Sequence, residues 1–362
     1  FKAGVEEGAL SVMSAFNDLN GVPCTVNRYL LREILKDACQ FKGFVVSDAN
    51  AIRECVNHGI ASDLEDAALK ACSAGVDMDM NSGLYHEYLM ELVQEGKLPL
   101  ELVDDAVRRI LRVKMALGLF DNPYLPEEKT GLYDELPKEH LAVALDAARR
   151  SIVLLKNENN VLPLNKEQRI ALIGELADMP VENFGSWALA GREKDCVTIY
   201  QGLKNAGAHV DYARCCGVTS DFDQAELERV AKDADVIVAV VGELASMSGE
   251  AASRADISLP GMQERMLEAA LSTGKPVIVV LMNGRPLALK WVAENVHAIV
   301  EAWQLGIQAG NAVAEVLFGV YNPSGRLCCT FPAMVGQCPR YYNHPNTGRP
   351  GGKSKFSSRY ID

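Results

Sequence analysis

The first third of the chain alternates short apolar runs with segments whose apolar positions recur at helical spacing. Three successive pairs of strand and helix are predicted, at residues 11–16 and 29–38, 44–47 and 64–74, and 76–80 and 85–95. A strand followed by a helix, repeated three times, is typical of parallel βα units. The first region is therefore expected to contain a parallel sheet covered by helices.

A longer helix is predicted at the end of this region. Its apolar residues are three or four positions apart, at Leu102, Ala106, Ile110, Val113 and Leu117. Gly118 follows directly and is a helix-ending signal. Residues 120–137 contain prolines and charged residues without a sustained period, so they are expected to link a first domain, residues 1–119, to a second domain, residues 138–362.

The second region begins with a predicted helix after Glu139. Six strands are predicted, at residues 151–155, 169–174, 236–241, 277–282, 298–302 and 326–331. Several are continuous runs of Val and Ile, as expected for parallel strands that helices cover on both faces. This pattern predicts an α/β sandwich whose segment after Phe331 is rich in loops.

Composition narrows the class of protein. Apolar residues make up 48% of the chain, which is typical of a folded protein. The formal net charge is −12, and a negative charge of this size repels nucleic acids and anionic membranes. The longest apolar runs are far shorter than the ~20 residues that span a bilayer. Neither a nucleic acid nor a membrane is expected as a partner.

Cysteine and histidine usage indicates no metal centre. The ten cysteines show no CxxC spacing and the six histidines are scattered, so free, mostly buried thiols in a reducing compartment are expected. This favours a cytoplasmic location. The chain begins at Phe1 rather than Met, and a leader upstream would make it periplasmic or secreted.

Common nucleotide-binding and hydrolase motifs are missing. The sequence has no GxGxxG, phosphate-binding loop or GxSxG motif. An NAD-linked oxidoreductase would rest on the α/β architecture alone.

Two carboxylates are more informative. Asp48 follows the apolar strand at residues 44–47, and active sites of parallel βα folds form at the carboxyl ends of strands. Glu250 lies in a loop of small residues after the strand at residues 236–241, with Arg254 placed to orient it. The alternatives are a helix cap for Asp48 and a solvated surface loop for Glu250.

A third acidic site, Asp77 with Asp79, is equally compatible with capping of a strand end.

Several stretches resemble glycoside hydrolase family 3. Four resemble the second half of the family's barrel domain: FKAGV at residues 1–5, GALSVMSAFNDLNGVP at 8–23, GFVVSD at 43–48 and AGVDMDM at 74–80. Four resemble the sandwich domain of its β-glucosidase branch: SIVLLKN at residues 151–157, MNGRPL at 282–287, YNPSGRL at 321–327 and NTGRP at 346–350.

The resemblance implies roles for particular residues. Asp48 occupies the nucleophile position and Glu250 the position of the general acid/base. The implied sugar subsite consists of Met13, Phe16, Ser186 and Trp187. Ala49 stands where the family often has an aromatic residue, which leaves specificity for the leaving group open.

The implied activity is that of an exo-acting, retaining β-glycoside hydrolase that releases terminal β-D-glucosyl residues from an oligosaccharide or β-glucoside by double displacement, without a cofactor or metal. The alternatives are a β-xylosidase or related exo-glycosidase, and a non-catalytic carbohydrate-binding homologue. A homodimer is left open. Because Glu250 lies in the second domain, the family's N-acetylglucosaminidase branch is disfavoured.

The implied fold is the carboxyl-terminal half of a (β/α)₈ barrel followed by an α/β sandwich domain. A closed barrel takes ~250 residues, and the family's upstream sugar-binding motifs have no counterpart here. We therefore expect an incomplete barrel, and little glycosidase activity from these 362 residues alone.

Overall fold

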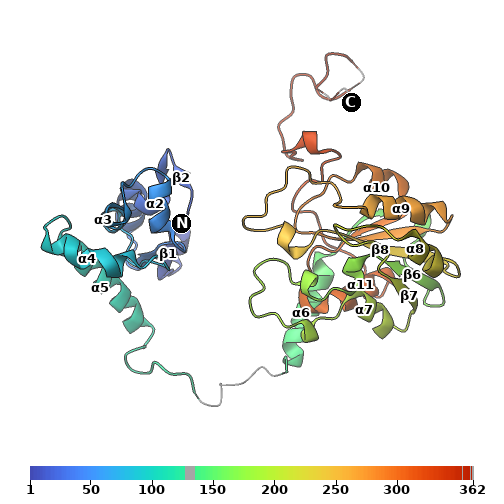
Figure 1. Cartoon of the computed structure of the whole chain (residues 1–362), viewed down its shortest axis with the longest axis horizontal. Coiled ribbons are helices and arrows are strands. Elements are labelled where there is room, and N and C mark those ends of the chain that lie inside the picture. The colour runs from blue at the N-terminus through green and yellow to red at the C-terminus, as the bar shows by residue number, and fades with distance from the viewer. Residues whose placement is uncertain (127–134, 353, 359, 361–362) are drawn as a thin grey trace. The chain divides into compact units, whose positions relative to one another are not determined.

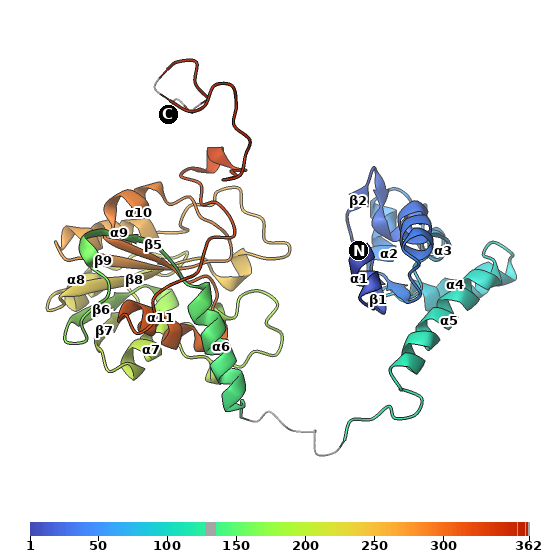
Figure 2. The same ribbon diagram turned by 180° about the vertical axis from the view of Figure 1, so that it is seen from behind.

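The computed structural model describes residues 1–126, 135–352, 354–358 and 360 (Figures 1 and 2). The chain divides into two compact units, Phe1–Leu132 and Tyr133–Asp362, and each is described by itself. Within the predicted linker, residues 127–134 lie outside the described part. Residues 120–126 and 135–137 form no helix or strand.

The first unit contains two adjacent parallel strands, β1 (Ser11–Met13) and β4 (Phe44–Val46), in which Met13 is opposite Val46. A small antiparallel ribbon, β2 (Asp18–Leu19) with β3 (Val22–Pro23), follows β1. The helices are α1 (Lys2–Glu6), the short 3-10 helix η1 (Cys24–Val26), the π-type η2 (Tyr29–Ala38), α2 (Ala51–Asn57), α3 (Leu64–Ala74), α4 (Leu84–Gln94) and α5 (Leu100–Ala116).

The helix α3 forms the centre of the first core. Its small residues Ala67, Ala68 and Ala71 are fully buried, which lets neighbouring helices approach closely. Asp63 caps its first turn through a hydrogen bond from the Asp66 amide, and Gly75 ends it with a φ of 115°. These local signals explain why its predicted bounds are correct.

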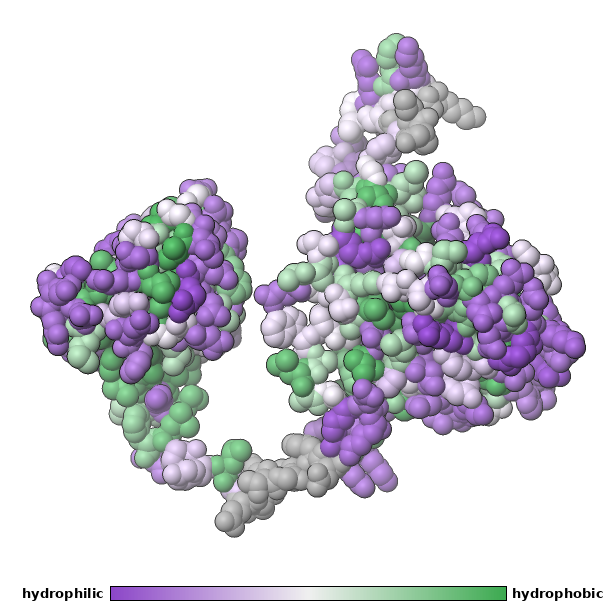
Figure 3. Space-filling view, viewed as in Figure 1, coloured by the Kyte–Doolittle hydropathy of each residue, from purple (hydrophilic) through white to green (hydrophobic). Residues whose placement is uncertain are grey.

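The helix α5 ends as predicted, because Gly118 adopts a φ of 69°. Arg109 donates to the carbonyls of Phe41 and Gly43, each at 3.0 Å, and so attaches α5 to the start of β4. The other face presents exposed apolar side chains, and this part of the helix is green in Figure 3. They are Val107, Leu111 and Met115.

One predicted strand of this unit is absent, and one helix was not predicted. Residues 76–80 form no strand but a single bridge between Met78 and Val46, because two successive amides, those of Asp77 and Met78, share the carbonyl of Val45. The helix α2 was missed, since its seven residues are too few for a clear apolar period.

The second unit is an α/β sandwich around a mixed sheet of strand order β5-β10-β9-β8-β6-β7. The strands are β5 (Val153–Asn157), β6 (Arg169–Ile173), β7 (His209–Ala213), β8 (Val236–Gly242), β9 (Val277–Met282) and β10 (Ala298–Glu301). Every residue of β8, β9 and β10 is buried. The apolar runs predict this burial for all of them except Glu301, the charged residue at the end of β10. However, β5 runs antiparallel to β10, so the sheet is not wholly parallel.

Helices cover both faces of this sheet (Figures 1 and 2). One core includes side chains of α6 (Lys138–Ser151), α7 (Ile199–Asn205) and α11 (Ala309–Leu317). The core on the other face includes side chains of α8 (Gln224–Ala231), α9 (Gln263–Ser272) and α10 (Lys290–Asn295).

The sequence prediction erred at two places in this unit. The edge strand β7 was missed because its sequence, HVDYA, alternates polar and apolar residues instead of forming an apolar run. The predicted strand at residues 326–331 is absent, and residues 326–329 are exposed loop without a partner strand in the described structure. Among the described residues after Phe331, the loop-rich segment contains one short helix, η10 (Val335–Gln337).

All ten cysteines are free thiols, and six are buried, which confirms the prediction of mostly buried thiols. Within the described residues, no helix is long and apolar enough to cross a membrane.

Candidate active site

Asp48 lies two residues beyond β4, at the carboxyl end of the parallel strands. The residue before it, Ser47, is fully buried; its amide donates to the Met78 carbonyl and its Oγ accepts from the Met80 amide, both at 2.9 Å. After it, Asn50 adopts a left-handed φ of 62° and the chain turns into α2. The backbone around Asp48 is thereby anchored, while its carboxylate is only half-buried and accepts the Ala49 amide at 2.8 Å.

Met13 ends β1 at the same edge. The amide of the next residue, Ser14, donates to the carbonyl of Val46, so the ends of β1 and β4 are joined. The Met13 side chain is 52% exposed, and Phe16, three residues later, is half-buried. The structure therefore places Met13 and Asp48 at adjoining strand ends.

The third acidic site stabilises local structure. The Asp77 carboxylate is buried and accepts Nζ of Lys36 at 2.7 Å and the Val45 amide at 2.8 Å. Burial lowers the pKa of Lys36, and the neighbouring Asp77 opposes that shift. Asp79 accepts the Ser82 hydroxyl at 2.5 Å and a backbone amide near the start of α4.

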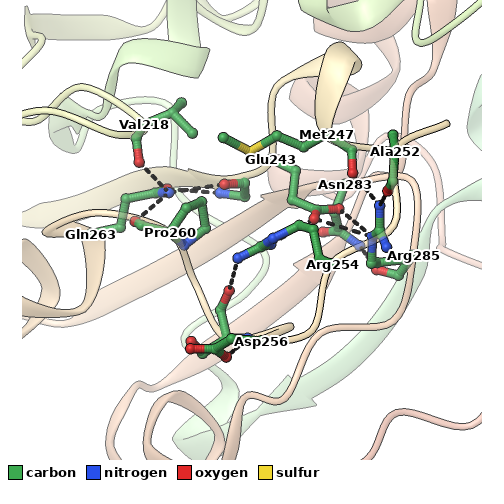
Figure 4. Close-up of polar contacts among 12 residues, drawn as sticks. Val218, Glu243, Met247, Ala252, Arg254, Asp256, Pro260, Gln263, Asn283 and Arg285 are labelled. Carbon is green, nitrogen blue, oxygen red and sulfur yellow. Dashed lines mark hydrogen bonds and ion pairs between the residues drawn. The ribbon is translucent and has the colours of Figure 1, made fainter. Parts of the chain in front are cut away.

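Glu250 is an exposed residue in the loop between β8 and α9. The prediction that Arg254 orients Glu250 was wrong. Arg254 donates instead to Oε1 of Glu243 at 2.6 Å and to the carbonyl of Ser258 at 3.1 Å (Figure 4). The buried carboxylate attracts this guanidinium because a charge removed from water needs a close partner.

Glu243 anchors both ends of the loop that carries Glu250. It is 1% exposed and accepts hydrogen bonds from both Arg254 and Arg285. Arg285 also donates to the carbonyls of Met247 and Ala252, on either side of Glu250 (Figure 4). Sequence analysis missed this cluster, since Arg285 is 42 positions from Glu243; the only signal was the MNGRPL motif.

Ser186 and Trp187 are exposed in a loop that follows the short helix η6 (Val181–Asn183). Trp187 is 68% exposed and has a positive φ of 65°. Ser186 packs against Gly249, where a Cβ would overlap its Oγ. The structure thus brings Ser186 beside the immediate neighbour of Glu250.

In the described part of the chain, no group of three or more His, Cys, Asp or Glu side chains is arranged to hold a metal ion.

Family models match both units. The glycosyl hydrolase family 3 N-terminal domain matches residues 1–113, and the family's C-terminal domain matches residues 152–360. The chain belongs to glycosyl hydrolase family 3.

Relatives within this family are named glycosidases. The chain is 43% identical to a periplasmic β-glucosidase from Salmonella typhimurium, over 100% of this chain and 52% of that protein. It is 40% identical to a β-xylosidase from Formosa agariphila, over 99% of this chain and 53% of that protein. The chain therefore spans about half the length of these family 3 relatives.

Solved structures of β-glucosidases are similar to this chain. A β-glucosidase from Listeria innocua is similar with a TM-score of 0.94 and 38% identity, covering 100% of this chain and 51% of that one. The same Listeria enzyme in complex with glucose gives a TM-score of 0.93 at the same identity, covering 100% of this chain and 50% of that one.

Proposed function

We propose that this family 3 chain supplies both catalytic carboxylates of an exo-acting, retaining β-glycoside hydrolase of the β-glucosidase type. Asp48 is the nucleophile and Glu250 the general acid/base. The observation that carries the proposal is the placement of Asp48: a half-exposed carboxylate on an anchored backbone, at the carboxyl end of two parallel strands.

The reaction is a double displacement. The Asp48 carboxylate attacks the anomeric carbon, and the bond from that carbon to the leaving oxygen breaks as Glu250 donates its proton to that oxygen. Water then attacks the glycosyl ester, Glu250 accepts the water's proton, and the sugar leaves with its β configuration. Retaining chemistry requires the two carboxyl groups to be roughly 5–5.5 Å apart.

Features of the Glu250 loop support its role. Its ends are fixed by Glu243 and two arginines, while Glu250 itself is exposed. We assign Met13, Phe16, Ser186 and Trp187 to the sugar subsite. The exposed indole of Trp187 and thioether of Met13 suit packing against the apolar face of a pyranose ring.

The sugar is proposed from the relatives. A terminal β-D-glucosyl residue agrees with the Salmonella and Listeria proteins, and the Formosa relative favours β-xylosidase activity as the second candidate. The ratio of kcat/KM for aryl β-glucoside and aryl β-xyloside separates the two.

We propose that residues 1–119 are the carboxyl-terminal part of a (β/α)₈ barrel, 120–137 a linker, and 138–362 the α/β sandwich domain. The two parallel strands and the Met78 bridge of the first unit support this assignment. Under this proposal, activity requires the first half of the barrel. A fusion that places the first barrel half of a family 3 relative ahead of Phe1 supplies it, and we call this fusion the completed enzyme. A periplasmic location is proposed by analogy with the Salmonella relative.

The test is trapping with a 2-deoxy-2-fluoro-β-glucosyl donor, whose covalent intermediate hydrolyses slowly. Mass spectrometry of the completed enzyme should find the label on Asp48, and Asp48→Asn should abolish labelling. Asp37→Asn, at an exposed position of η2, is the matched control and should label normally. Sugar binding without labelling would instead support the non-catalytic, carbohydrate-binding alternative, and labelling of another residue would refute the assignment of Asp48.

A further inference from the structure

A buried carboxyl group that the proposed reaction does not use lies at the carboxyl end of β10. Glu301 is 0% exposed. Its Oε1 accepts the Trp303 amide at 2.8 Å, and its Oε2 accepts Nδ2 of Asn283 at 3.3 Å. Burial raises the pKa of Glu301 to about 8, although both hydrogen bonds oppose the shift.

Two further polar groups, one on Asn283 and one on Gln304, three positions after Glu301, are buried without a hydrogen-bond partner in the described structure. They are Oδ1 of Asn283, which is itself 0% exposed, and Nε2 of Gln304. A buried donor or acceptor without a partner destabilises the fold, because its hydrogen bonds to water are lost and not replaced. Most buried polar groups are hydrogen-bonded, so each exception in a native structure needs a structural or functional reason.

Contacts from Glu301 extend to both candidate substrate loops. Gln304, next to Trp303, packs so closely on Gly185 that a Cβ there would overlap its Oε1. Gly284, next to Asn283, packs in the same way on Ser248. Gly185 precedes Ser186, and Ser248 lies two positions before Glu250.

The backbone of these loops is held in uncommon conformations. Trp187, Ala251 and Trp303 have positive φ values of 65°, 56° and 50°. Each such conformation is strained and persists only where surrounding contacts enforce it. For Trp303, the hydrogen bond to Glu301 is one of those contacts.

We propose that Glu301 is a positioning residue that sets the placement of the Ser186–Trp187 loop and of the Glu250 loop, through Trp303 and Gln304 on one side and through Asn283 and Gly284 on the other. The significance of this placement for catalysis rests on the function proposed above, but the coupling itself does not.

Few charges surround Glu301. Strand β9 is apolar throughout, and Lys156 on β5 pairs with Glu158 at 3.0 Å. Arg285, in the loop after β9, is bound to Glu243. Arg326 and Cys328 line a surface cavity together with Trp303 and Gln304. Deprotonation of Glu301 therefore places a charge among mainly apolar and neutral neighbours, and those neighbours must adjust.

The tryptophans provide the experiment, because all three of the chain, Trp187, Trp291 and Trp303, lie in this unit. The 362-residue chain labelled with ¹⁵N-tryptophan is titrated from pH 6 to 9.5 and followed by NMR. We expect the signals of Trp303 and Trp187 to shift with a common midpoint near pH 8. The variant Glu301→Gln keeps the shape of the side chain without the charge. In this variant the signals of both tryptophans should stay constant over this pH range.

The matched control is Glu294→Gln, an exposed carboxyl on α10, which should titrate like the wild type. The proposal is overturned if Trp187 does not respond at the midpoint of Trp303, or if Glu301→Gln retains the shifts. Should that variant not fold, the wild-type titration decides alone, since separate midpoints reject the coupling. The experiment measures no hydrolysis, so its failure and a failed trapping experiment are distinguishable.

Discussion

Removal of the Glu243 carboxylate should destabilise the second unit strongly. Glu243 is fully buried, whereas the side chains of Arg254 and Arg285 are 20% and 22% exposed, so Glu243→Ala leaves two largely buried guanidinium groups without their shared acceptor. Breaking a buried ion pair in this way costs about 3–5 kcal/mol. This is a large part of the ~5–15 kcal/mol that stabilises a typical domain.

The expected loss is measurable by melting. For a domain of 150–250 residues, each 1 kcal/mol lowers Tm by roughly 2–4 °C, so Glu243→Ala should lower it by about 6–20 °C. Tryptophan fluorescence reports the transition of the second unit, since the first unit contains no tryptophan.

The control is an exposed pair in the same unit. Glu226 contacts Arg229 at 2.9 Å on the surface of α8, and exposed ion pairs contribute little to stability. Glu226→Ala should therefore leave Tm almost unchanged. Equal shifts for the two variants would refute the argument that burial makes the Glu243 cluster an anchor of the loop.

Three further outcomes are expected. Gly249→Ala places a Cβ against Ser186 at a φ of 96°, so it should lower both Tm and the activity of the completed enzyme. The control Gly274→Ala also has a positive φ, but its Cβ meets open space, so it should lower only Tm. In thiol titration with an aromatic disulfide, the three exposed cysteines should react first and the six buried ones only on unfolding. Burial raises the pKa of Cys55 to about 11, and early reaction of the six buried thiols would contradict their burial. The pKa of Glu301 is about 8 in the folded state and ~4.3 in the unfolded state, so the folded state retains the proton to higher pH. The stability of the wild type should therefore fall from pH 5 to 8 relative to that of Glu301→Gln. Parallel pH profiles of the two proteins in urea unfolding would disprove this.

Local sequence signals were sufficient for most elements with strong patterns. The apolar run 277–282 is the strand β9 with unchanged bounds, and Asp63 and Gly75 enclose α3 where the pattern predicts a helix. They failed where neighbours decide the conformation. A stretch such as residues 76–80, VDMDM, becomes a strand only if it forms regular backbone pairs. Here the carboxylate of Asp77 accepts from Lys36 and from the Val45 amide instead.

In the candidate site, too, some features could be predicted from local sequence and others depend on distant neighbours. The positions of Asp48 and Glu250 after apolar strands were visible in the sequence, because the end of a strand is a local property. The partner of Arg254 was not, since sequence distance favours Glu250 at four positions over Glu243 at eleven. Burial reverses that preference, because a buried carboxylate left without a partner destabilises the fold far more than an exposed one does.

Family membership, the α/β class and the candidate acids followed from the order of residues along the chain, as motifs and apolar periods are encoded locally. The antiparallel placement of β5, the Glu243 anchor and the contacts of Glu301 depend on segments that are distant in sequence and adjacent after folding. Their energies come from burial and from charge in a medium of low polarity, and both arise only when the chain packs.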